Sequence, residues 1–326
     1  MSERRKLETA LNKAASTPPP TLGQQTFPPG ARDDLAGRPL YIAVQLIQMC
    51  FEIGLPIYWT RTGVLTWSTD AAAFTRSAYV PREALIAFRA IATLIVLYVC
   101  VRLIRMPDGP TELQDVKGNT QTYMHGGLWR FQSLTVWCWS LLGVFFFAAT
   151  VVTVTGASPL VSSLIELLLG TVTGYALLCS LVANFILIPA AAKKFVTTEE
   201  KYFCFEALMM HNMNLLLLAI ELVIDDLHVN WRHIPIGLLW GSTFTLWHTT
   251  LRYDWTRTLL YFFLNWQLKG CTVWLTVLKG VMGFGLVLGF LIAEYARAAA
   301  WGPAAVAIGA VLSIRLRCPP ITAKAE

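Results

Sequence analysis

The sequence predicts an all-α protein, a polytopic transmembrane helical bundle with about seven spans. Of its 326 residues, 55% are hydrophobic and only 14% are charged, which is far more apolar than a soluble domain. The apolar residues also gather in stretches long enough to cross the hydrocarbon core of a bilayer. Because the loops between these stretches are mostly short, one compact bundle is expected rather than separate soluble domains.

Seven stretches meet the length and apolarity expected of a span. In chain order they are residues 40–58, 83–104, 131–153, 160–192, 205–224, 234–251 and 271–294. An eighth, Pro303–Leu316, is shorter, and the sequence leaves open whether it crosses. The bundle is therefore expected over residues 39–316, followed by a short cytosolic tail at 317–326.

Residues 1–38 are expected to form a disordered cytosolic region. They are rich in Pro, Thr and charge, with the runs Pro18–Pro20 and Pro28–Gly30. The segment lacks an apolar core of the kind a signal peptide needs, so the first span is expected to act as the insertion signal.

The formal charge of +6 indicates membrane orientation and not nucleic-acid binding, because most of the basic residues lie on one side of the predicted spans. One side holds Arg4, Arg5, Lys6, Lys13, Arg32, Arg38, Arg105, Lys117, Arg130, Lys193, Lys194, Lys201, Arg252, Arg257, Lys269, Arg315, Arg317 and Lys324. The other side holds Arg61, Arg76, Arg82, Arg232 and Arg297. The positive-inside rule then places the N-terminus in the cytosol. The protein is expected in the endoplasmic reticulum or the plasma membrane.

A polar stripe runs along the fifth predicted span. At about 100° per residue, an α-helix brings His211, Asn214, Glu221 and Asp225 onto one narrow arc, while leucines cover the rest. Ionisable groups in hydrocarbon are costly and usually face a bundle interior, where they mark chemistry, relays or ion paths. The alternative is that the stripe only joins helices by hydrogen bonds.

A hydroxyl group is expected at the same depth as this histidine. The third span begins within the segment Gly126–Trp139. On the topology derived from the charges, the third and fifth spans both enter the membrane from the cytosolic side, and Thr135 and His211 each lie ~7 Å from that end of their helix, in the same leaflet. A neutral imidazole within hydrogen-bond range is the usual activator of a hydroxyl nucleophile. Thr135 competes with two other interpretations: threonine in a helix usually bonds its own backbone one turn back, and Ser133 is an equally good hydroxyl on the opposite side.

The same residues resemble the androgen-induced membrane protein family, which includes the ADTRP proteins. The resemblance rests on Gly126–Phe131, Leu134-Thr135 and Val144–Phe146, on Met210-His211 with its apolar run to Glu221, and on the order of the spans between 125 and 295. The segment Leu260–Trp266 is similar to a motif of the related rolling stone proteins.

The resemblance implies an intramembrane threonine hydrolase that cleaves fatty acid esters of hydroxy fatty acids, with Thr135 as nucleophile and His211 as base. Gln132 and Ser133 are two extra residues relative to the family pattern, so alignment from Trp129 would place Ser133 at the nucleophile position. Alignment from the apolar run that follows places Thr135 there, and we favour that alignment.

The sequence thus predicts a lipid ester hydrolase that requires no cofactor and no metal, with membrane lipids and a lipid ester as its partners. Candidates to orient the base or to stabilise the oxyanion are Asn212, Asn214, Glu221 and Gln132. Two alternatives stay open: a non-catalytic scaffold or complex subunit, and a channel or transporter with a polar path at His211. Among the other histidines, His233 is expected to be solvated and His248 to be an interfacial or packing residue.

Overall fold

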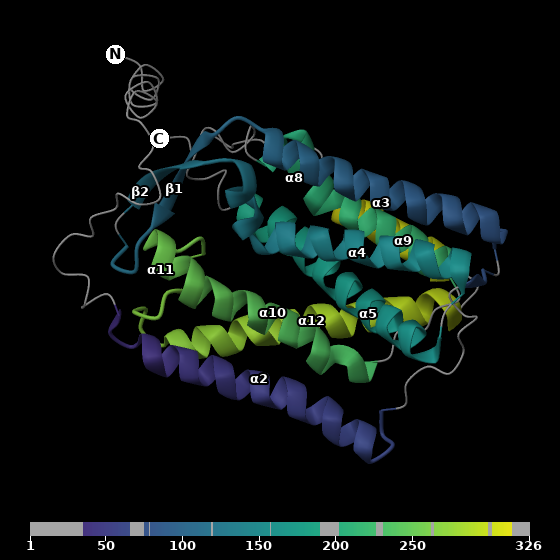
Figure 1. Cartoon of the computed structure of the whole chain (residues 1–326), viewed down its shortest axis with the longest axis horizontal. Helices are drawn as coiled ribbons and strands as arrows, with labels where there is room; N and C mark the ends of the chain where they lie inside the picture. Colours follow the sequence, from purple (N-terminus) through teal and green to yellow (C-terminus); the bar gives the residue numbers. More distant parts are fainter. Residues whose placement is uncertain are drawn as a thin grey trace, which may run out of the picture.

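The structure is a computed structural model that describes residues 35–65, 75–77, 79–118, 120–156, 158–189, 202–225, 231–261, 264–298 and 302–314. Residues 1–34 of the predicted N-terminal region 1–38, the whole of the predicted tail 317–326, and His228, in the loop predicted between the fifth and sixth spans, therefore lie outside the described residues. Figure 1 shows long helices packed side by side, with a small hairpin at one end.

Six helices are long and apolar enough to cross a membrane. They are α2 (Arg38–Arg61), α3 (Arg82–Arg105), α4 (Leu134–Thr155), α5 (Pro159–Val182) with its continuation η4 (Ala183–Leu187), the run of α8 (Phe205–Leu208), η5 (Met209–Met213) and α9 (Asn214–Ile224), and α12 (Cys271–Ala298). These helices confirm the predicted class of multi-pass, all-α membrane protein.

The remaining predicted spans also form helices, but shorter ones. The sixth predicted span is α10 (Ile234–Trp247), which follows the short η6 (Trp231–His233) and continues through η7 (His248–Arg252) into α11 (Tyr253–Thr256). The eighth stretch forms α13 (Gly302–Ser313), a short apolar helix that packs against α9 and α12.

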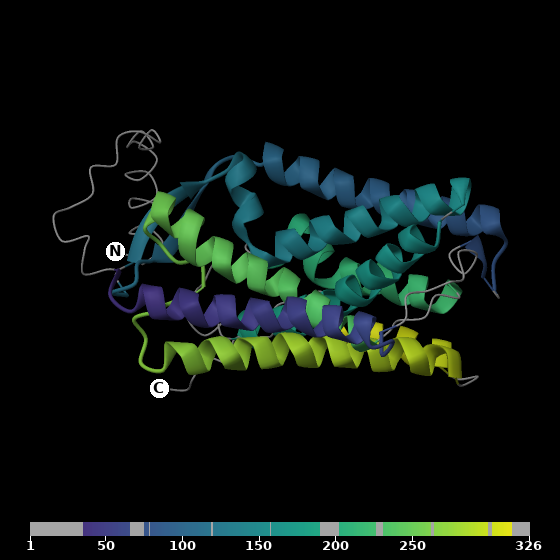
Figure 2. The ribbon, with the colours of Figure 1, turned by 60° about the horizontal axis from the view of Figure 1, so that its bottom comes forward.

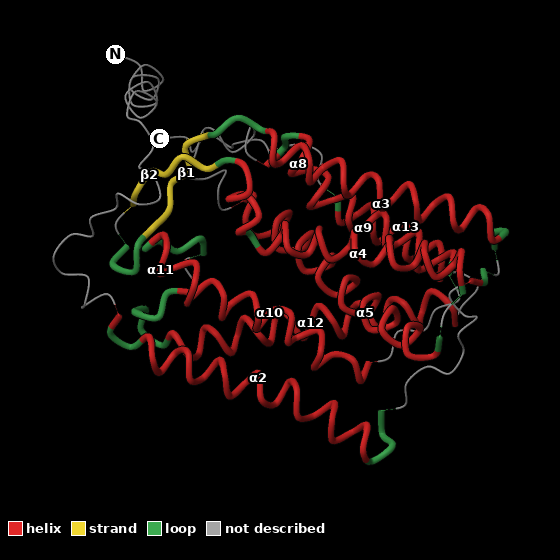
Figure 3. Tube along the Cα trace, in the orientation of Figure 1, coloured by secondary structure: helices red, strands yellow, loops and turns green. Residues whose placement is uncertain are grey.

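An antiparallel hairpin at one end of the bundle was not predicted. Its strands are β1 (Gly109–Gln114) and β2 (Thr120–His125), paired from Gly109 with His125 to Gln114 with Thr120. In the turn, the Lys117 amide donates to the Asp115 side chain at 2.9 Å, and Gly118 takes φ 85°, a conformation that favours glycine. Figure 3 shows this hairpin, in yellow, at the end of the bundle where α3 ends and η3 (Gly127–Gln132) leads into α4.

Helix packing uses small residues where two helices come closest. A Cβ atom added to Gly285 or Gly289 of α12 would lie 3.1–3.2 Å from the backbone of Gly174 in α5. Gly280 has no such neighbour among the described residues, so only part of the glycine series in this span serves close approach. Figure 2 shows α2 and α12 running side by side along one side of the bundle.

Buried ion pairs join helices that are distant in sequence. Arg89 of α3 donates to Glu221 of α9 at 2.6 Å and to Asp225, at the end of that helix, at 2.8 Å. All three side chains are fully buried. Arg89 also donates to the Thr153 hydroxyl of α4, so one guanidinium ties three helices together.

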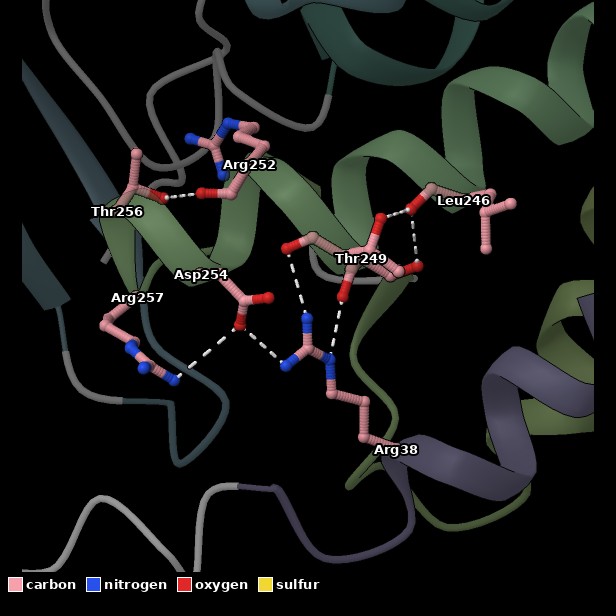
Figure 4. A network of polar contacts seen from close by, with 8 residues as sticks. Arg38, Leu246, Thr249, Arg252, Asp254, Thr256 and Arg257 are labelled. Carbon is pink, nitrogen blue, oxygen red and sulfur yellow. Dashed lines mark hydrogen bonds and ion pairs between the residues drawn. The ribbon is translucent and has the colours of Figure 1, made fainter.

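Arg38 makes a similar tie at the start of α2. Its guanidinium donates to the Thr249 carbonyl at 2.9 Å and to the Thr250 carbonyl at 3.1 Å, and it pairs with Asp254 at 2.7 Å (Figure 4). The two carbonyls belong to η7, whose wide turn disturbs the usual helical bonding. The planar fork of Arg38 therefore anchors α2 to this π-helical segment.

Candidate functional site

Three π-helical segments in the described part of the chain each carry a polar residue. Asn184 lies in η4, His211 in η5 and His248 in η7. Single π turns inside α-helices occur frequently at functional sites. Asn184 of η4 donates to Asn212 of η5 at 2.8 Å, which joins two of these segments directly. The third, η7, is connected only indirectly: the His248 ring lies 6.1 Å from that of Tyr261, whose phenol oxygen accepts from the Leu134 amide of α4, and α4 packs against η5.

His211 lies on η5, at the centre of this region. Its carbonyl accepts a hydrogen bond from the Ser180 hydroxyl of α5 at 2.6 Å, which fixes the backbone at the wide turn. Its Nδ1 atom is buried, and within the described residues this atom has no hydrogen-bond partner. An imidazole nitrogen held out of water without a partner can accept a proton from a group brought to it.

The Thr135 hydroxyl lies in the first turn of α4. Elsewhere in this helix, threonines bond their own backbone: Thr150 donates to Phe146 at 2.7 Å and Thr153 to Ala149 at 2.6 Å. The acceptor that Thr135 would use, the carbonyl of Phe131, instead accepts from the Trp137 indole at 2.9 Å. Across the described ranges, the Thr135 hydroxyl makes no hydrogen bond, so the usual back-bonded arrangement is absent.

Thr135 shares its side of α4 with Trp139 and Leu142, which follow at four and seven residues. Both belong to the core cluster that also contains Met210 of η5 and Leu217 of α9. Among the described residues Thr135 and His211 do not hydrogen-bond to each other. The helical segments that carry them, α4 and η5, are in contact.

Ser133 has a structural role. It is the N-cap of α4, and its Oγ atom accepts from the Val136 amide at 3.2 Å. Ser133→Ala is therefore expected to destabilise the protein by about 1 kcal/mol without abolishing any activity that depends on Thr135. Thermal unfolding of the purified variant in detergent measures this loss, and an unchanged midpoint would contradict the capping role.

Glu221 is engaged away from His211. It forms the buried pair with Arg89 described above, ten residues along the chain from His211 and so about three turns away. The π turn also changes the angular position of His211 relative to the rest of α9, which the regular helical period did not predict. An orienting role for Glu221 is therefore not supported by its contacts.

The predicted amide candidates bond to neighbouring helices. Asn212 accepts from Asn184, which also donates to the Ser313 carbonyl of α13 at 2.8 Å. The Oδ1 atom of Asn214 accepts from the Leu215 amide at 2.7 Å and lies 3.0 Å from the Ser180 hydroxyl oxygen. These amides fix α5, η5 and α13 around His211.

Gln132 comes closest to the role expected of an oxyanion donor. It is buried just before α4, and its Oε1 atom accepts from Arg252 at 2.6 Å. This bond orients the amide, and its NH₂ group makes no hydrogen bond among the described residues. Gln132 lies three residues before Thr135 in the chain.

Tyr261 was not predicted as part of the site. Its phenol oxygen accepts from the Leu134 amide at 3.1 Å, directly beside Thr135. Burial raises the pKa of Tyr261, so the phenol stays neutral. Its sequence signal was the segment Leu260–Trp266, in which Asn265 also donates to the Val116 carbonyl of the hairpin turn at 2.9 Å.

His248 packs inside the bundle. Its side chain is fully buried, its ring lies 5.8 Å from that of Phe244, and its Nε2 atom accepts from the Leu260 amide at 3.1 Å. This bond fixes the segment that carries Tyr261.

His233 is buried at the start of α10, so the expectation that it is solvated was wrong. Burial lowers the pKa of His233 to about 4, although a Glu166 oxygen lies 3.9 Å away. Because the unfolded state takes up this proton near pH 6.5, stability is full above that pH and is lost as the pH falls toward 4. At pH 5 we expect the loss to reach about 2 kcal/mol.

The melting temperature measured at pH 7.5 and at pH 5 tests this expectation. His233→Gln should reduce the difference between the two values, since glutamine does not titrate. An equal pH dependence in both proteins would show that other groups cause the loss.

Comparisons with models of protein families, with curated proteins and with solved structures found no match for this chain. The family resemblance therefore rests on the short motifs alone and stays a hypothesis.

Proposed function

We propose that this protein is an integral-membrane lipid ester hydrolase in which Thr135 is the nucleophile and His211 the base. The observation that carries the proposal is that Thr135 and the Nδ1 atom of His211 both lack hydrogen-bond partners among the described residues, on two helical segments that pack together. Other buried polar atoms of the described residues also lack partners, among them the Ser162 hydroxyl and the Nδ1 atom of His248, so what distinguishes this pair is the packing of α4 against η5.

The reaction would follow the acyl-transfer sequence. The Thr135 hydroxyl oxygen forms a bond to the ester carbonyl carbon while His211 takes the hydroxyl proton. The C–O bond to the leaving alcohol then breaks, and His211 returns the proton to that alkoxide. Water, activated by His211, hydrolyses the acyl-threonine ester and releases the free acid.

Neighbouring groups support this chemistry. The amide of Gln132 is the best-placed candidate for the oxyanion, since Arg252 holds its carbonyl oxygen. Tyr261 and Trp137 hold the first turn of α4 through the Leu134 amide and the Phe131 carbonyl. The proposal requires an acyl chain to reach these residues from the hydrocarbon region.

The charge asymmetry of the loops supports a cytosolic N-terminus and a site in the cytosolic leaflet, in the endoplasmic reticulum or the plasma membrane. The expected partners are membrane lipids and the ester substrate itself.

The contacts of the polar stripe give less support to a channel or transporter. Glu221 and Asp225 bond to Arg89, Asn214 to Ser180, and Asn184 to Asn212. A conducting path needs groups that can exchange partners, whereas these groups join neighbouring helices. A non-catalytic scaffold accounts for such contacts, and it predicts no ester turnover by the purified protein.

A turnover assay tests the proposal. Purified full-length protein in detergent is given a branched fatty acid ester, and free acid is measured by mass spectrometry. Time-dependent release, blocked by a covalent probe for serine and threonine hydrolases, is the expected result. Release no faster than in empty micelles, across esters of several chain lengths, would reject the hydrolase.

A further inference from the structure

A groove of about 410 Å³ lies between α2 and α10. Ile53 and Ile57 of α2 line one side and are each about half exposed, while Ile236 and Leu239 of α10 line the other. An open apolar surface on a helix long enough to span a membrane faces acyl chains rather than water. The volume is near the lower limit of about 300–1,000 Å³ for small-molecule sites, so it suits one acyl chain rather than a whole lipid.

The groove extends from one end of α2 toward the middle of the membrane. Arg61, the last residue of α2, lines its outer end, and Glu52 lines its inner end. At 1.5 Å per residue, these two positions lie ~13 Å apart along the helix axis. One leaflet contributes half of the hydrocarbon core of a bilayer, which is ~15 Å. The groove therefore has about the length of the acyl layer of one leaflet.

Aromatic residues place the outer end of the groove at the level of the lipid headgroups. The ring of Trp59 in α2 lies 5.8 Å from that of Trp231, which begins η6 just before α10. The Arg232 guanidinium lies 5.3 Å from the Trp231 ring. Tryptophan is enriched where the hydrocarbon meets the headgroups, so Arg61, two residues after Trp59, lies near the depth of the phosphates. This end of α2 is the one farther from the hairpin (Figure 1).

Arg61 gives the outer end of the groove a positive charge. Its side chain is exposed, and it makes no hydrogen bond or ion pair within the described ranges. At the inner end, the buried Glu52 carboxylate accepts from the Ser242 hydroxyl and lies 3.4 Å from Lys279 of α12. The charges of Glu52 and Lys279 offset each other, so Arg61 supplies the net charge of the lining. An arginine fork matches the geometry of a phosphate, and a basic residue at the membrane surface favours anionic lipids.

We propose that the α2–α10 groove holds one acyl chain of an anionic phospholipid of the bilayer, whose phosphate pairs with Arg61. The chain lies along Ile57, Ile53 and Leu239 and ends near Glu52. Because the two isoleucines are half exposed, the groove is open to the bilayer, and the second chain of the lipid remains outside it. A sterol would bring no phosphate to Arg61. This site is independent of the proposed hydrolysis.

Photolabelling of full-length protein in nanodiscs tests the proposal. The probe is a phosphatidylglycerol with a diazirine midway along one acyl chain, present as a minor component in phosphatidylcholine. Its labelling of peptides from α2 and α10 is expected to saturate. Unlabelled phosphatidylglycerol should compete about two- to fivefold better than added phosphatidylcholine, the size expected of one exposed ion pair. Oleic acid at the same mole fraction should compete less well than phosphatidylglycerol.

Variants separate the acyl-chain site from the headgroup site. Ile57→Trp fills the groove with an indole and should remove the saturable labelling. Ile47→Trp is the matched control, because Ile47 is another exposed isoleucine of α2 but does not line the groove. Arg61→Gln should make the two phospholipids compete equally, whereas Arg61→Lys keeps the charge and should retain most of the preference.

Labelling that does not saturate, that survives Ile57→Trp, or that falls equally in Ile47→Trp would overturn the proposal. Equal competition by the two phospholipids in the wild type would overturn it as well. If oleic acid competed better than phosphatidylglycerol, the occupant would be a free fatty acid and the proposal would be wrong. Thr135→Ala should label like the wild type, so loss of hydrolysis and loss of this site can be told apart.

Discussion

Thr135→Ala and His211→Ala are each expected to abolish measurable ester hydrolysis. Loss of a general base typically costs about 10²–10⁴-fold in rate, and loss of a nucleophile costs at least as much. Since the two groups act in one step, the double variant should be no slower than either single variant. Free-acid release by purified proteins, matched for folding by size-exclusion profile, gives the comparison.

Thr150→Ala is the matched control. Its hydroxyl lies in the same helix and is bonded to the Phe146 carbonyl, so its loss should leave turnover near that of the wild type. Full activity in Thr135→Ala, or equal losses in Thr135→Ala and Thr150→Ala, would show that the hydroxyl of Thr135 has no chemical role.

The second large effect is expected at Arg89. Arg89→Met leaves the buried carboxylates of Glu221 and Asp225 without their cation, and breaking a buried pair in this way typically costs about 3–5 kcal/mol. We expect a large fall in the unfolding midpoint in detergent, or loss of folded protein. The triple variant Arg89→Met, Glu221→Gln, Asp225→Asn should recover much of this loss, because no unpaired charge remains.

This result would also separate structure from chemistry. Glu221→Gln should lower stability while leaving the turnover of the folded fraction close to normal. If the triple variant were as unstable as Arg89→Met alone, the loss would not come from unpaired charges, and the interpretation of this network as a buried, charge-neutral set of ion pairs between helices would be wrong.

The spans could be predicted from the sequence because the length and apolarity of a stretch are local properties that the bilayer imposes. The π turns at Asn184, His211 and His248 could not, since their stability depends on partners from other segments. Ser180 fixes the His211 carbonyl, and Arg38 bonds two carbonyls of η7 from more than 200 residues away. The hairpin was missed because its strands lie in a polar connection that the search for apolar spans passes over.

The candidate site was predictable in part. A histidine in an apolar helix is visible in the sequence, and so is a threonine at the same depth. Two other contacts could not be predicted: the Trp137 indole donates to the Phe131 carbonyl, and Ser133 caps α4. Both depend on side-chain directions, which residue spacing in the sequence does not determine. Glu221 and His211 would lie on the same side of the helix only if the α-helical period ran unbroken between them, and the π turn η5 interrupts it. The partner of Glu221 is Arg89, which lies in a separate span.

Trapping the acyl-enzyme tests the central claim most directly. Wild-type protein is mixed with the branched ester, quenched in acid within one turnover, digested and analysed by peptide mass. The account predicts an acyl group on Thr135 that is absent from the Thr135→Ala variant. An acyl group on Ser133, or turnover with no acylated peptide at all, would contradict it.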